Sequence, residues 1–402
     1  MGYINLTDYN DTMHTSIKVG KLIGIPIKLH FTFLFILFMF IFAFANGSAT
    51  EYRIPLGVGD LGLPALYRYS LSTIAAVLFF FTLLLHEMAH SYVAMNFGTK
   101  IHSITLFFFG GLAMMEEIPK SPGKEWRIAI AGPIMSFAIG ALFYLLYTGL
   151  NALNLHFYHP IGILILVIAY FNIVLAIFNL IPAFPMDGGR IFRAILAKRM
   201  SFIKATRRAV LVGKIFAGVM IIVGIAKADP FTYILTGEWG YNLWLPILAL
   251  FLYMAAAEEE KATTTFATLE GLKVKNVMRT ERISVSDDMP LLMLVRKMRE
   301  EKTREYAVVN ESGDLKGFIT LDDIKKIPAE QRHFFSVSDA MSPFDSVVTI
   351  ISEEEDASEA LRMMMKWQSD ILVVKGGMRE ELVGILTRND LAIYIEMLKG
   401  SV

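Results

Sequence analysis

Residues 83–94 read LLLHEMAHSYVA, which places ionisable side chains in an otherwise apolar helical segment. His86 and His90 are four positions apart, so on a helix both imidazoles lie on one face and can reach a single zinc ion. Glu87 is offset by about 100° and can act on a water molecule beside the ion. Each of these groups costs on the order of several kcal/mol in hydrocarbon unless it has a partner. A metal site therefore explains the segment better than a structural hydrogen-bond cluster does.

A hydrolytic zinc site needs a third protein ligand, and Asp187 is the acid that best fits this role. It belongs to residues 178–190, FNLIPAFPMDGGR, where Pro182 and Pro185 interrupt a helical pattern. Backbone groups freed there are tolerated at membrane depth only inside protein or beside water, as in a catalytic cavity. A turn residue before two glycines is the alternative role for Asp187. Asn179 is either a polar contact within its helix or a hydrogen-bond donor to substrate.

The composition is that of a membrane protein joined to a soluble domain. Of the 402 residues, 54% are hydrophobic and 19% are charged, which is too apolar for an ordinary soluble chain of this length. Charges are sparse up to about residue 254 and dense from Glu258 onward. The formal net charge is +0 and no large basic face is present, so nucleic acid is not an expected partner. Because the chain has no cysteine, a metal must be held by His, Asp or Glu.

Six segments are apolar and long enough to cross a bilayer roughly 30 Å thick as helices. They lie near residues 30–45, 70–96, 128–150, 161–181, 209–225 and 241–257. Lysine and arginine gather before the first segment, between the second and third, and between the fourth and fifth, so these loops are expected in the cytoplasm. Both termini then face the cytoplasm, and the two halves of the metal site, on the second segment and after the fourth, lie at similar depths toward that side.

A diverged internal repeat follows the last apolar segment. At the start of each copy, VKNVMRT at residues 274–280 aligns with VSDAMSP at residues 337–343. Near the end of each copy, GFITLDDI at residues 317–324 aligns with GILTRNDL at residues 384–391. Each copy also has an amphipathic helix, near residues 291–300 or 357–366, followed by a β-rich run. Two β-α-β-β-α units are the simplest interpretation.

The expected fold is a polytopic α-helical membrane protein with about six transmembrane helices, followed by a soluble α/β module. We expect the boundaries to be a transmembrane domain at 1–260, a polar linker at 261–270 and a tandem module at 271–402, with repeats at about 271–330 and 334–398. The polar and acidic N-terminal residues do not have the pattern of a cleaved signal peptide. We therefore expect the chain in the cell membrane, in contact with lipid.

The sequence resembles the site-2 protease family of intramembrane zinc metalloproteases, in the branch that carries tandem CBS domains. The likeness rests on the motifs described above and on three more, at residues 23–30, 110–113 and 131–133. It implies that His86, His90 and Asp187 bind one zinc ion. It further implies that Glu87 is the general base and that the substrates are transmembrane helices of other proteins. Asn179 is a further candidate catalytic residue, and the resemblance makes the first, fifth and sixth spans a candidate substrate gate.

The resemblance of the repeats to CBS domains implies a regulatory adenine nucleotide, ATP, ADP or AMP, in a cleft between the two copies. In that motif the acid bonds ribose hydroxyls and the hydroxyl side chain lies near phosphate, which here would involve Thr320 and Asp323 in the first copy and Thr387 and Asp390 in the second. The alternative is a pair of helix N-caps without any ligand, since Thr and Asp favour that position. The two motifs give two possible nucleotide clefts, and the nucleotide would fill both of them or only one. CBS pairs commonly form larger discs, so the resemblance also implies a homodimer.

Residues 104–111, ITLFFFGG, are too short to span a bilayer and rich in β-forming residues, so we expect a re-entrant extended stretch. An exposed backbone edge beside the zinc would let an unwound substrate helix pair with it, whereas a plain interfacial loop is the alternative. Two other function classes share some of these features. A CBS-regulated ion channel or transporter has no need of His-Glu-x-x-His with a distal Asp, and a catalytically dead binding protein has no need of the complete set of ligands and base.

Overall fold

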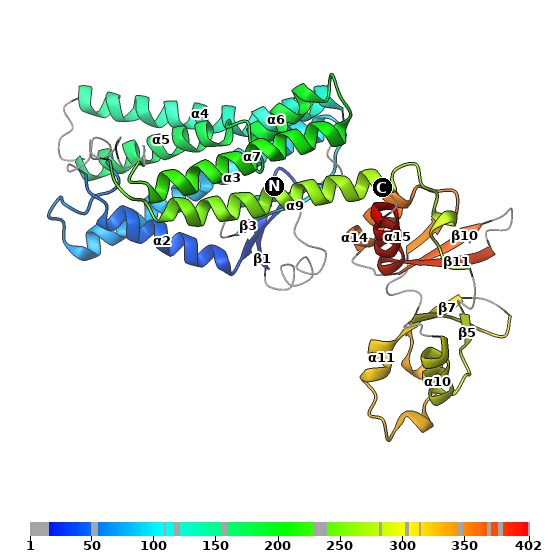
Figure 1. The fold of residues 1–402 in the computed structure, drawn as a ribbon. Coiled ribbons are helices and arrows are strands. Elements are labelled where there is room, and N and C mark those ends of the chain that lie inside the picture. The colour runs from blue at the N-terminus through cyan, green and yellow to red at the C-terminus, as the bar shows by residue number, and fades with distance from the viewer. Residues whose placement is uncertain are drawn as a thin grey trace. The chain divides into compact units, whose positions relative to one another are not determined.

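The computed structural model describes residues 16–49, 55–107, 110–115, 121–153, 159–228, 233, 239–280, 284–301, 305–312, 315–343, 349–367, 371–376 and 381–400. The chain divides into two compact units, Met1–Thr263 and Thr264–Val402. In Figure 1 the first unit is a bundle of long helices with a small sheet, and the second consists of short helices and strands.

The first unit is built on helices that coincide with all six expected spans. They are α2 (Thr32–Asn46), α3 (Ala65–Asn96), α4 (Pro122–Ala152), α5 (His159–Asn179), α7 (Phe202–Ile225) and α9 (Trp244–Leu269), and a short helix, α6 (Asp187–Leu196), follows α5. Among the described residues, α3, α4, α7 and α5 from Pro160 are long and apolar enough to cross a membrane. The apolar helix α2 is shorter, and the apolar part of α9 runs into acidic residues. Length and composition thus support four of the six expected crossings.

Most of the expected linker at 261–270 is part of helix α9. The helix begins at Trp244 and continues through residues 261–269, which the sequence had indicated as a polar connection between the domains. The unit boundary at Thr263 therefore falls inside a continuous helix. The run from Ala262 to Thr268 contains no proline or glycine, so nothing in this stretch interrupts the backbone ladder of hydrogen bonds.

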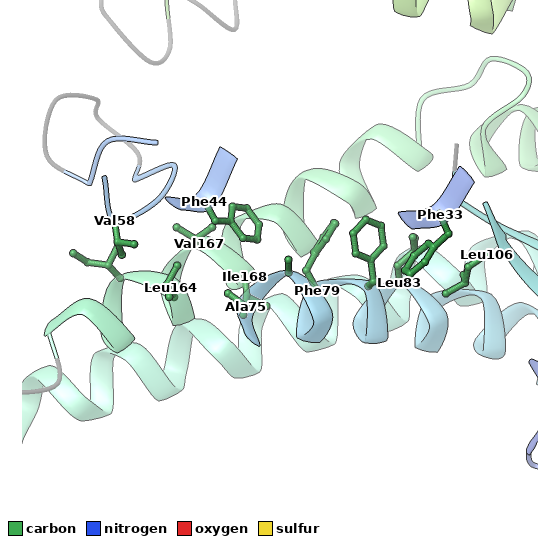
Figure 2. Packing of buried hydrophobic residues seen from close by; sticks show 13 residues of the cluster. Phe33, Phe44, Val58, Ala75, Phe79, Leu83, Leu106, Leu164, Val167 and Ile168 are labelled. Carbon is green, nitrogen blue, oxygen red and sulfur yellow. The ribbon is translucent and has the colours of Figure 1, made fainter. Parts of the chain in front are cut away.

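The core of the first unit lies between α2, α3 and α5. Figure 2 shows a row of buried side chains along this interface, with Phe33 and Phe44 from α2, Phe79 and Leu83 from α3, and Val167 from α5 among them. On the same interface, the ring of Phe40 stacks on that of Phe79 with centroids 5.1 Å apart. Since lipid tails are as apolar as these side chains, close packing rather than exclusion from water stabilises helix pairs of this kind.

The outer faces of the helices carry large apolar side chains. Leu145 of α4 is 65% exposed, Ile222 of α7 is 66% exposed and Ile74 of α3 is 64% exposed. An exposed apolar surface of this extent would be an aggregation hazard in water, but it suits a lipid environment. The pattern of exposure therefore agrees with membrane insertion of the first unit.

A four-stranded sheet accompanies the helices, in the order β1 (Ser16–Leu22), β2 (Ile25–His30), β3 (Ile101–Phe107) and β4 (Gly110–Met115). β2 and β3 run parallel, and the outer pairs are antiparallel. Residues 104–107 and 110–111 are therefore extended as expected and do not form a plain loop, whereas residues 108 and 109 lie outside the described residues. The sequence reading missed the partner strands, although Ile25, Ile27 and Leu29 alternate with polar or small positions as in a half-buried strand.

The sheet packs on the part of α3 that carries the histidines. Ile25 and Ile27 of β2 and Ile104 of β3 form one buried cluster with Leu84 and Met88 of α3. Leu84 and Met88 flank Glu87 in sequence, so this cluster holds the sheet beside the turn of helix that bears the candidate site. It thereby sets the position of β4, which is the strand after β3.

The second unit contains the two predicted β-α-β-β-α copies. The first comprises β5 (Ser284–Ser286), α10 (Leu291–Glu301), β6 (Glu305–Val309), β7 (Leu315–Thr320) and α11 (Leu321–Lys325). The second comprises β9 (Thr349–Ser352), α14 (Ala357–Trp367), β10 (Ile371–Gly376), β11 (Glu381–Thr387) and α15 (Arg388–Gly400). In each copy the first two strands pair in parallel and the last two antiparallel. The repeat seen in the sequence is therefore a repeat of structure.

The two copies share a core and exchange short strand segments. Phe318 of β7 and Ile385 of β11 belong to one buried cluster with residues of β6 and β10. Strand β8 (Ser342–Pro343), which precedes the second copy, pairs with β7 of the first. In the equivalent way, Arg279, which precedes the first copy, forms a bridge to Ile385 of the second. Each copy therefore completes the edge of the other.

Candidate metal centre

The three predicted ligands come together at one point. His86 and His90 belong to α3, and Asp187 is the first residue of α6. The Nε2 atoms of the two histidines are 3.2 Å apart, and Oδ2 of Asp187 lies 3.3 Å from Nε2 of His86 and 3.1 Å from Nε2 of His90. Both imidazoles are buried, and Asp187 is mostly so. Each residue thus offers one ligand atom to a common centre.

Hydrogen bonds on the far side of each ring determine which nitrogen faces this centre. Nδ1 of His90 lies 2.7 Å from the carbonyl oxygen of Ile128, which can only accept, so Nδ1 carries a proton and, in the neutral ring that binds a metal, Nε2 has the lone pair. Nδ1 of His86 lies 2.8 Å from Oγ of Ser136, which can accept in the same way. Two imidazole lone pairs and a carboxylate oxygen then point at one another, an arrangement that a cation stabilises.

The spacing of these atoms fits zinc. Ligands about 2.0 to 2.1 Å from a tetrahedral zinc ion lie roughly 3.3 Å from one another. The separations of 3.1, 3.2 and 3.3 Å among the three atoms agree with that value. Two histidines and one carboxylate are also a donor set typical of hydrolytic zinc, with one position left for water.

Gly132 of α4 lies directly against the ligands. A Cβ atom at this position would overlap Nε2 of His90 and would lie 2.6 Å from Nε2 of His86. Any side chain here would therefore occupy the space in front of the two ligand atoms. Residues 131–133 appear in the family resemblance without a stated role, and the structure explains why the central one is glycine.

Glu87 is half-buried next to this centre, and its Oε2 atom is buried without a hydrogen-bond partner among the described residues. Gly111 of β4 lies beside it, because a Cβ atom there would overlap Cγ of Glu87. β4 is the outer strand of the described sheet, with β3 as its neighbour there. The backbone of the edge strand β4 therefore lies next to the carboxylate of Glu87, which is the predicted general base.

The turn before Asp187 is packed backbone against backbone. A Cβ atom on Gly188 would overlap the carbonyl oxygens of Leu180 and Ile181, and one on Gly189 would lie 2.6 Å from the backbone of Ala183 and Phe184. The glycines after Asp187 thus let α6 start close under the end of α5. This close approach brings the Asp187 carboxylate to within 3.3 Å of both histidines, and its role as a metal ligand stays a prediction.

Asn179 is the last residue of α5, and its side-chain amide donates to the carbonyl oxygen of Leu175 at 3.0 Å. This is the contact within its own helix that the sequence allowed as one alternative. Among the described contacts, none joins Asn179 to the three ligands. A catalytic role for Asn179 stays a prediction.

A buried ion network that sequence reasoning missed joins three helices near the site. Arg193 of α6 donates from Nε to Glu125 of α4 at 2.7 Å and from Nη1 to Glu259 of α9 at 3.0 Å. The guanidinium also lies 4.8 Å from the ring centroid of Phe184 and 4.7 Å from that of Phe202. All three charged side chains are almost fully buried. Charged residues in apolar surroundings were the available signal, but their partners are far apart in sequence.

The predicted nucleotide-contacting residues form helix caps in the structure. Oγ1 of Thr320 accepts from the backbone nitrogen of Asp323, and the Asp323 carboxylate accepts from the backbone and hydroxyl of Thr320. Thr387 and Asp390 make the same reciprocal contacts. Burial opposes ionisation of Asp323, but hydrogen bonds from Lys326 and Thr320 outweigh it and lower the pKa of the carboxyl. Capping does not exclude a ligand, since each carboxylate has further lone pairs.

Comparison with known proteins decides the family. The sequence model of peptidase family M50 matches residues 74–156 and 151–223, which contain the histidines and Asp187. A zinc metalloprotease of Methanocaldococcus jannaschii is 32% identical over 387 residues, covering 96% of this chain and 98% of that protein. The chain belongs to peptidase family M50.

Further similarities extend over both units of this M50 protein. The structure of a site-2 protease from M. jannaschii is 34% identical and covers 61% of this chain and 95% of its own, with a TM-score of 0.41. Stage IV sporulation protein FB of Bacillus subtilis is 28% identical over 125 residues, 31% of this chain and 41% of that protein. The CBS domain model matches residues 274–330 and 337–396. The M50 chain is thus a membrane zinc metalloprotease of the site-2 type with tandem CBS domains.

Proposed function

We propose that this M50 protease hydrolyses peptide bonds within transmembrane segments of other membrane proteins, with one zinc ion held by His86, His90 and Asp187. The observation that carries the proposal is the convergence of the three ligand atoms at zinc spacing inside a bundle of apolar helices. A channel or transporter would use intramembrane acids as a pathway and would not require this donor set beside a half-buried glutamate.

The chemistry falls to a few side chains. Bound zinc would supply a Lewis acid that polarises the scissile carbonyl and lowers the pKa of water at the site. Glu87 would take the proton from the attacking water and deliver it to the departing amine nitrogen, and its Oε2 atom has no hydrogen-bond partner in the described part of the chain that would compete with this transfer. Ser136 and the carbonyl of Ile128 would keep the two imidazoles in the tautomer that ligation needs.

The substrate would have to leave the helical state before it is cut. Peptide groups inside a helix already pair with one another, whereas an extended segment can pair with an exposed strand edge. The outer edge of β4 beside Glu87 would receive such a segment and hold one of its peptide bonds near the site. The basic loops support an orientation in which this side of the first unit, the N-terminus and the CBS domains face the cytoplasm, from which water would enter.

The CBS module would add regulation by an adenine nucleotide. The support is the match of both repeats to CBS domains and the Thr-x-x-Asp motif in each, at Thr320 and Asp323 and at Thr387 and Asp390. A nucleotide can change proteolysis only if it binds two states of the enzyme with different affinity. Assembly of the module into a homodimer would provide such states through the approach of two membrane domains.

The catalytic assignment is tested by metal analysis together with cleavage of a single-span membrane substrate. Glu87→Gln should keep about one zinc per chain, as in the wild type, but lose cleavage, because an amide cannot accept the proton from water. Glu311→Gln, an exposed change in the second unit, serves as the matched control and should cleave normally. The double variant His86→Ala, His90→Ala should lose zinc. Undiminished cleavage by Glu87→Gln, or full zinc in the double variant, would exclude the assignment.

A further inference from the structure

We propose that the two CBS clefts of this chain are inequivalent: an adenine nucleotide binds the cleft of Thr320 and Asp323, while Arg279 of the chain itself closes the cleft of Thr387 and Asp390. The inference rests on the proposed nucleotide binding and specifies which of the duplicated motifs takes part in it. It predicts one nucleotide per chain rather than two.

Each cleft is assembled from both copies of the repeat. The acid of the first copy lies in the first turn of α11, directly after β7, and in β7 Phe318 pairs with Ser342. The acid of the second copy lies in the first turn of α15, directly after β11, and in β11 Ile385 pairs with Arg279. In the repeat alignment Phe318 corresponds to Ile385, and Ser342 corresponds to Arg279. Arg279 and Ser342 therefore hold the same position relative to the motif of the opposite copy.

In the cleft of the second copy, the arginine engages the motif. Nε of Arg279 lies 2.6 Å from Oδ1 of Asp390, and Nη2 lies 3.3 Å from Oγ1 of Thr387. The other carboxylate oxygen, Oδ2, accepts from the backbone nitrogen of Thr387 at 3.0 Å and from its hydroxyl at 2.7 Å. Both oxygens of the acid and the threonine hydroxyl thus have partners within the chain.

In the cleft of the first copy, the cation that contacts the acid is easier for a ribose to displace. Oδ2 of Asp323 makes the same contacts with Thr320, at 3.1 and 2.7 Å, but Oδ1 accepts from Lys326 at 2.8 Å. The Lys326 side chain is 74% exposed, whereas that of Arg279 is 33% exposed. An exposed lysine gives up such a contact at little cost, because its ammonium group returns to water.

Displacing Arg279 would cost more. The two acids are equally buried, with side chains 10% exposed for Asp390 and 11% for Asp323, so the difference lies in the cations. The guanidinium of Arg279 is 33% exposed and regains less contact with water on leaving than the ammonium group of Lys326, which is already 74% exposed. Arginine also holds a carboxylate with a rigid, planar set of donors that a flexible lysine lacks. A ribose would therefore replace Lys326 on Asp323 far more readily than Arg279 on Asp390.

The same arginine could instead serve a nucleotide by turning toward its phosphates. In that case both clefts would fill, and loss of Arg279 would weaken binding to the second one. The two roles predict opposite effects of removing the guanidinium, so one substitution separates them.

The experiment exchanges the two equivalent residues in the full-length chain in detergent, with ATP, ADP and AMP each titrated by calorimetry. The wild type should bind one nucleotide per chain for the best of the three. Arg279→Ser should raise this to two, and Ser342→Arg should lower it to none. The combined exchange should bind one, and Asp390→Ala should then abolish binding. Lys326→Ala is the control for loss of a cation and should leave one nucleotide bound.

Single substitutions of the acids complete the test. In the wild-type background Asp323→Ala should abolish binding, and Asp390→Ala should leave it unchanged. Retained zinc content and an unchanged circular dichroism spectrum show that each variant is folded. Two nucleotides per chain in the wild type, or fewer bound by Arg279→Ser than by the wild type, would overturn the inequivalence alone. No binding of any of the three to the wild type or to Arg279→Ser would overturn the nucleotide proposal as well.

Discussion

Several single residues around the metal centre act on the ligands without being ligands themselves. Ser136 and the Ile128 carbonyl bond the far nitrogens of the two rings, and Gly132 leaves room in front of the near ones. Such contacts set the tautomer and the direction of an imidazole before any metal binds. The geometry at His86 therefore depends on one hydroxyl group from a different helix.

Ser136→Ala should weaken zinc binding by roughly 10-fold to 100-fold, because Nδ1 of His86 loses the acceptor that fixes its tautomer. The dissociation constant can be measured by competition with a chelator of known affinity. Thr148→Ala removes an exposed hydroxyl from the same helix and should leave the constant unchanged. An unchanged constant in Ser136→Ala would mean that packing alone orients the ring.

At the scale of elements, α6 links the metal centre to its surroundings. The helix begins with Asp187, and one face of it carries Arg193, which bonds α4 through Glu125 and α9 through Glu259. Removing one member of a buried ion network leaves the others uncompensated, which is more costly than removing the whole network. The network thus holds three helices, including the one that supplies the third ligand.

Arg193→Met should destabilise the first unit by about 3 to 5 kcal/mol, because it leaves two buried glutamates without the guanidinium that bonds them both. Thermal unfolding in detergent measures the loss. The triple variant Glu125→Gln, Arg193→Met, Glu259→Gln should recover part of the stability, since the Arg193 cation and the two glutamate charges that it bonds are removed together. Arg208→Met, on the exposed face of α7, should have little effect. If the single and triple variants were equally unstable, charge would not be the cause.

At the scale of the whole molecule, one helix joins the two units. α9 packs on α7 near its start, through residues such as Ala249 and Leu252, and its end is buried in the core of the second unit through Leu269. Because Glu259 lies on the same helix, a displacement of α9 would act on Arg193 and hence on α6. A nucleotide effect on proteolysis would have a continuous path along this element.

Replacing Ala262, Thr263 and Thr264 of α9 with glycine should uncouple nucleotide binding from proteolysis, since each glycine costs a helix about 1 kcal/mol relative to alanine. In the wild type, saturating ATP, ADP or AMP should change the rate of substrate cleavage. The glycine variant should bind nucleotide and cleave substrate but respond less. Thr263→Ala, Thr264→Ala keeps the helix and should respond normally. A full response in the glycine variant would rule out this path, and no response in the wild type would leave the module a docking or dimerisation element.

Much of this protein could be predicted from the sequence because the signals are local. The lengths of the apolar segments indicated helices at every predicted span, and the four-residue spacing of His86 and His90 placed both rings on one helix face. The duplicated motifs predicted the β-α-β-β-α units. Asp187 could be predicted as the third ligand because it is an acid in an apolar segment whose helical pattern is interrupted by two prolines. Hydrophobicity and spacing can be read from one segment, and a repeat from the comparison of two segments, without knowing which residues pack together.

The tertiary structure decided which distant groups meet. It alone paired His86 with Ser136, Arg193 with two glutamates on other helices, and Arg279 with Asp390 of the other repeat. It placed the edge of β4 beside Glu87 and made the expected linker part of α9. No local pattern predicts these pairings, because packing selects one partner among many residues of the same type. The inequivalence of the two CBS clefts therefore follows from where a single arginine of one copy meets the acid of the other.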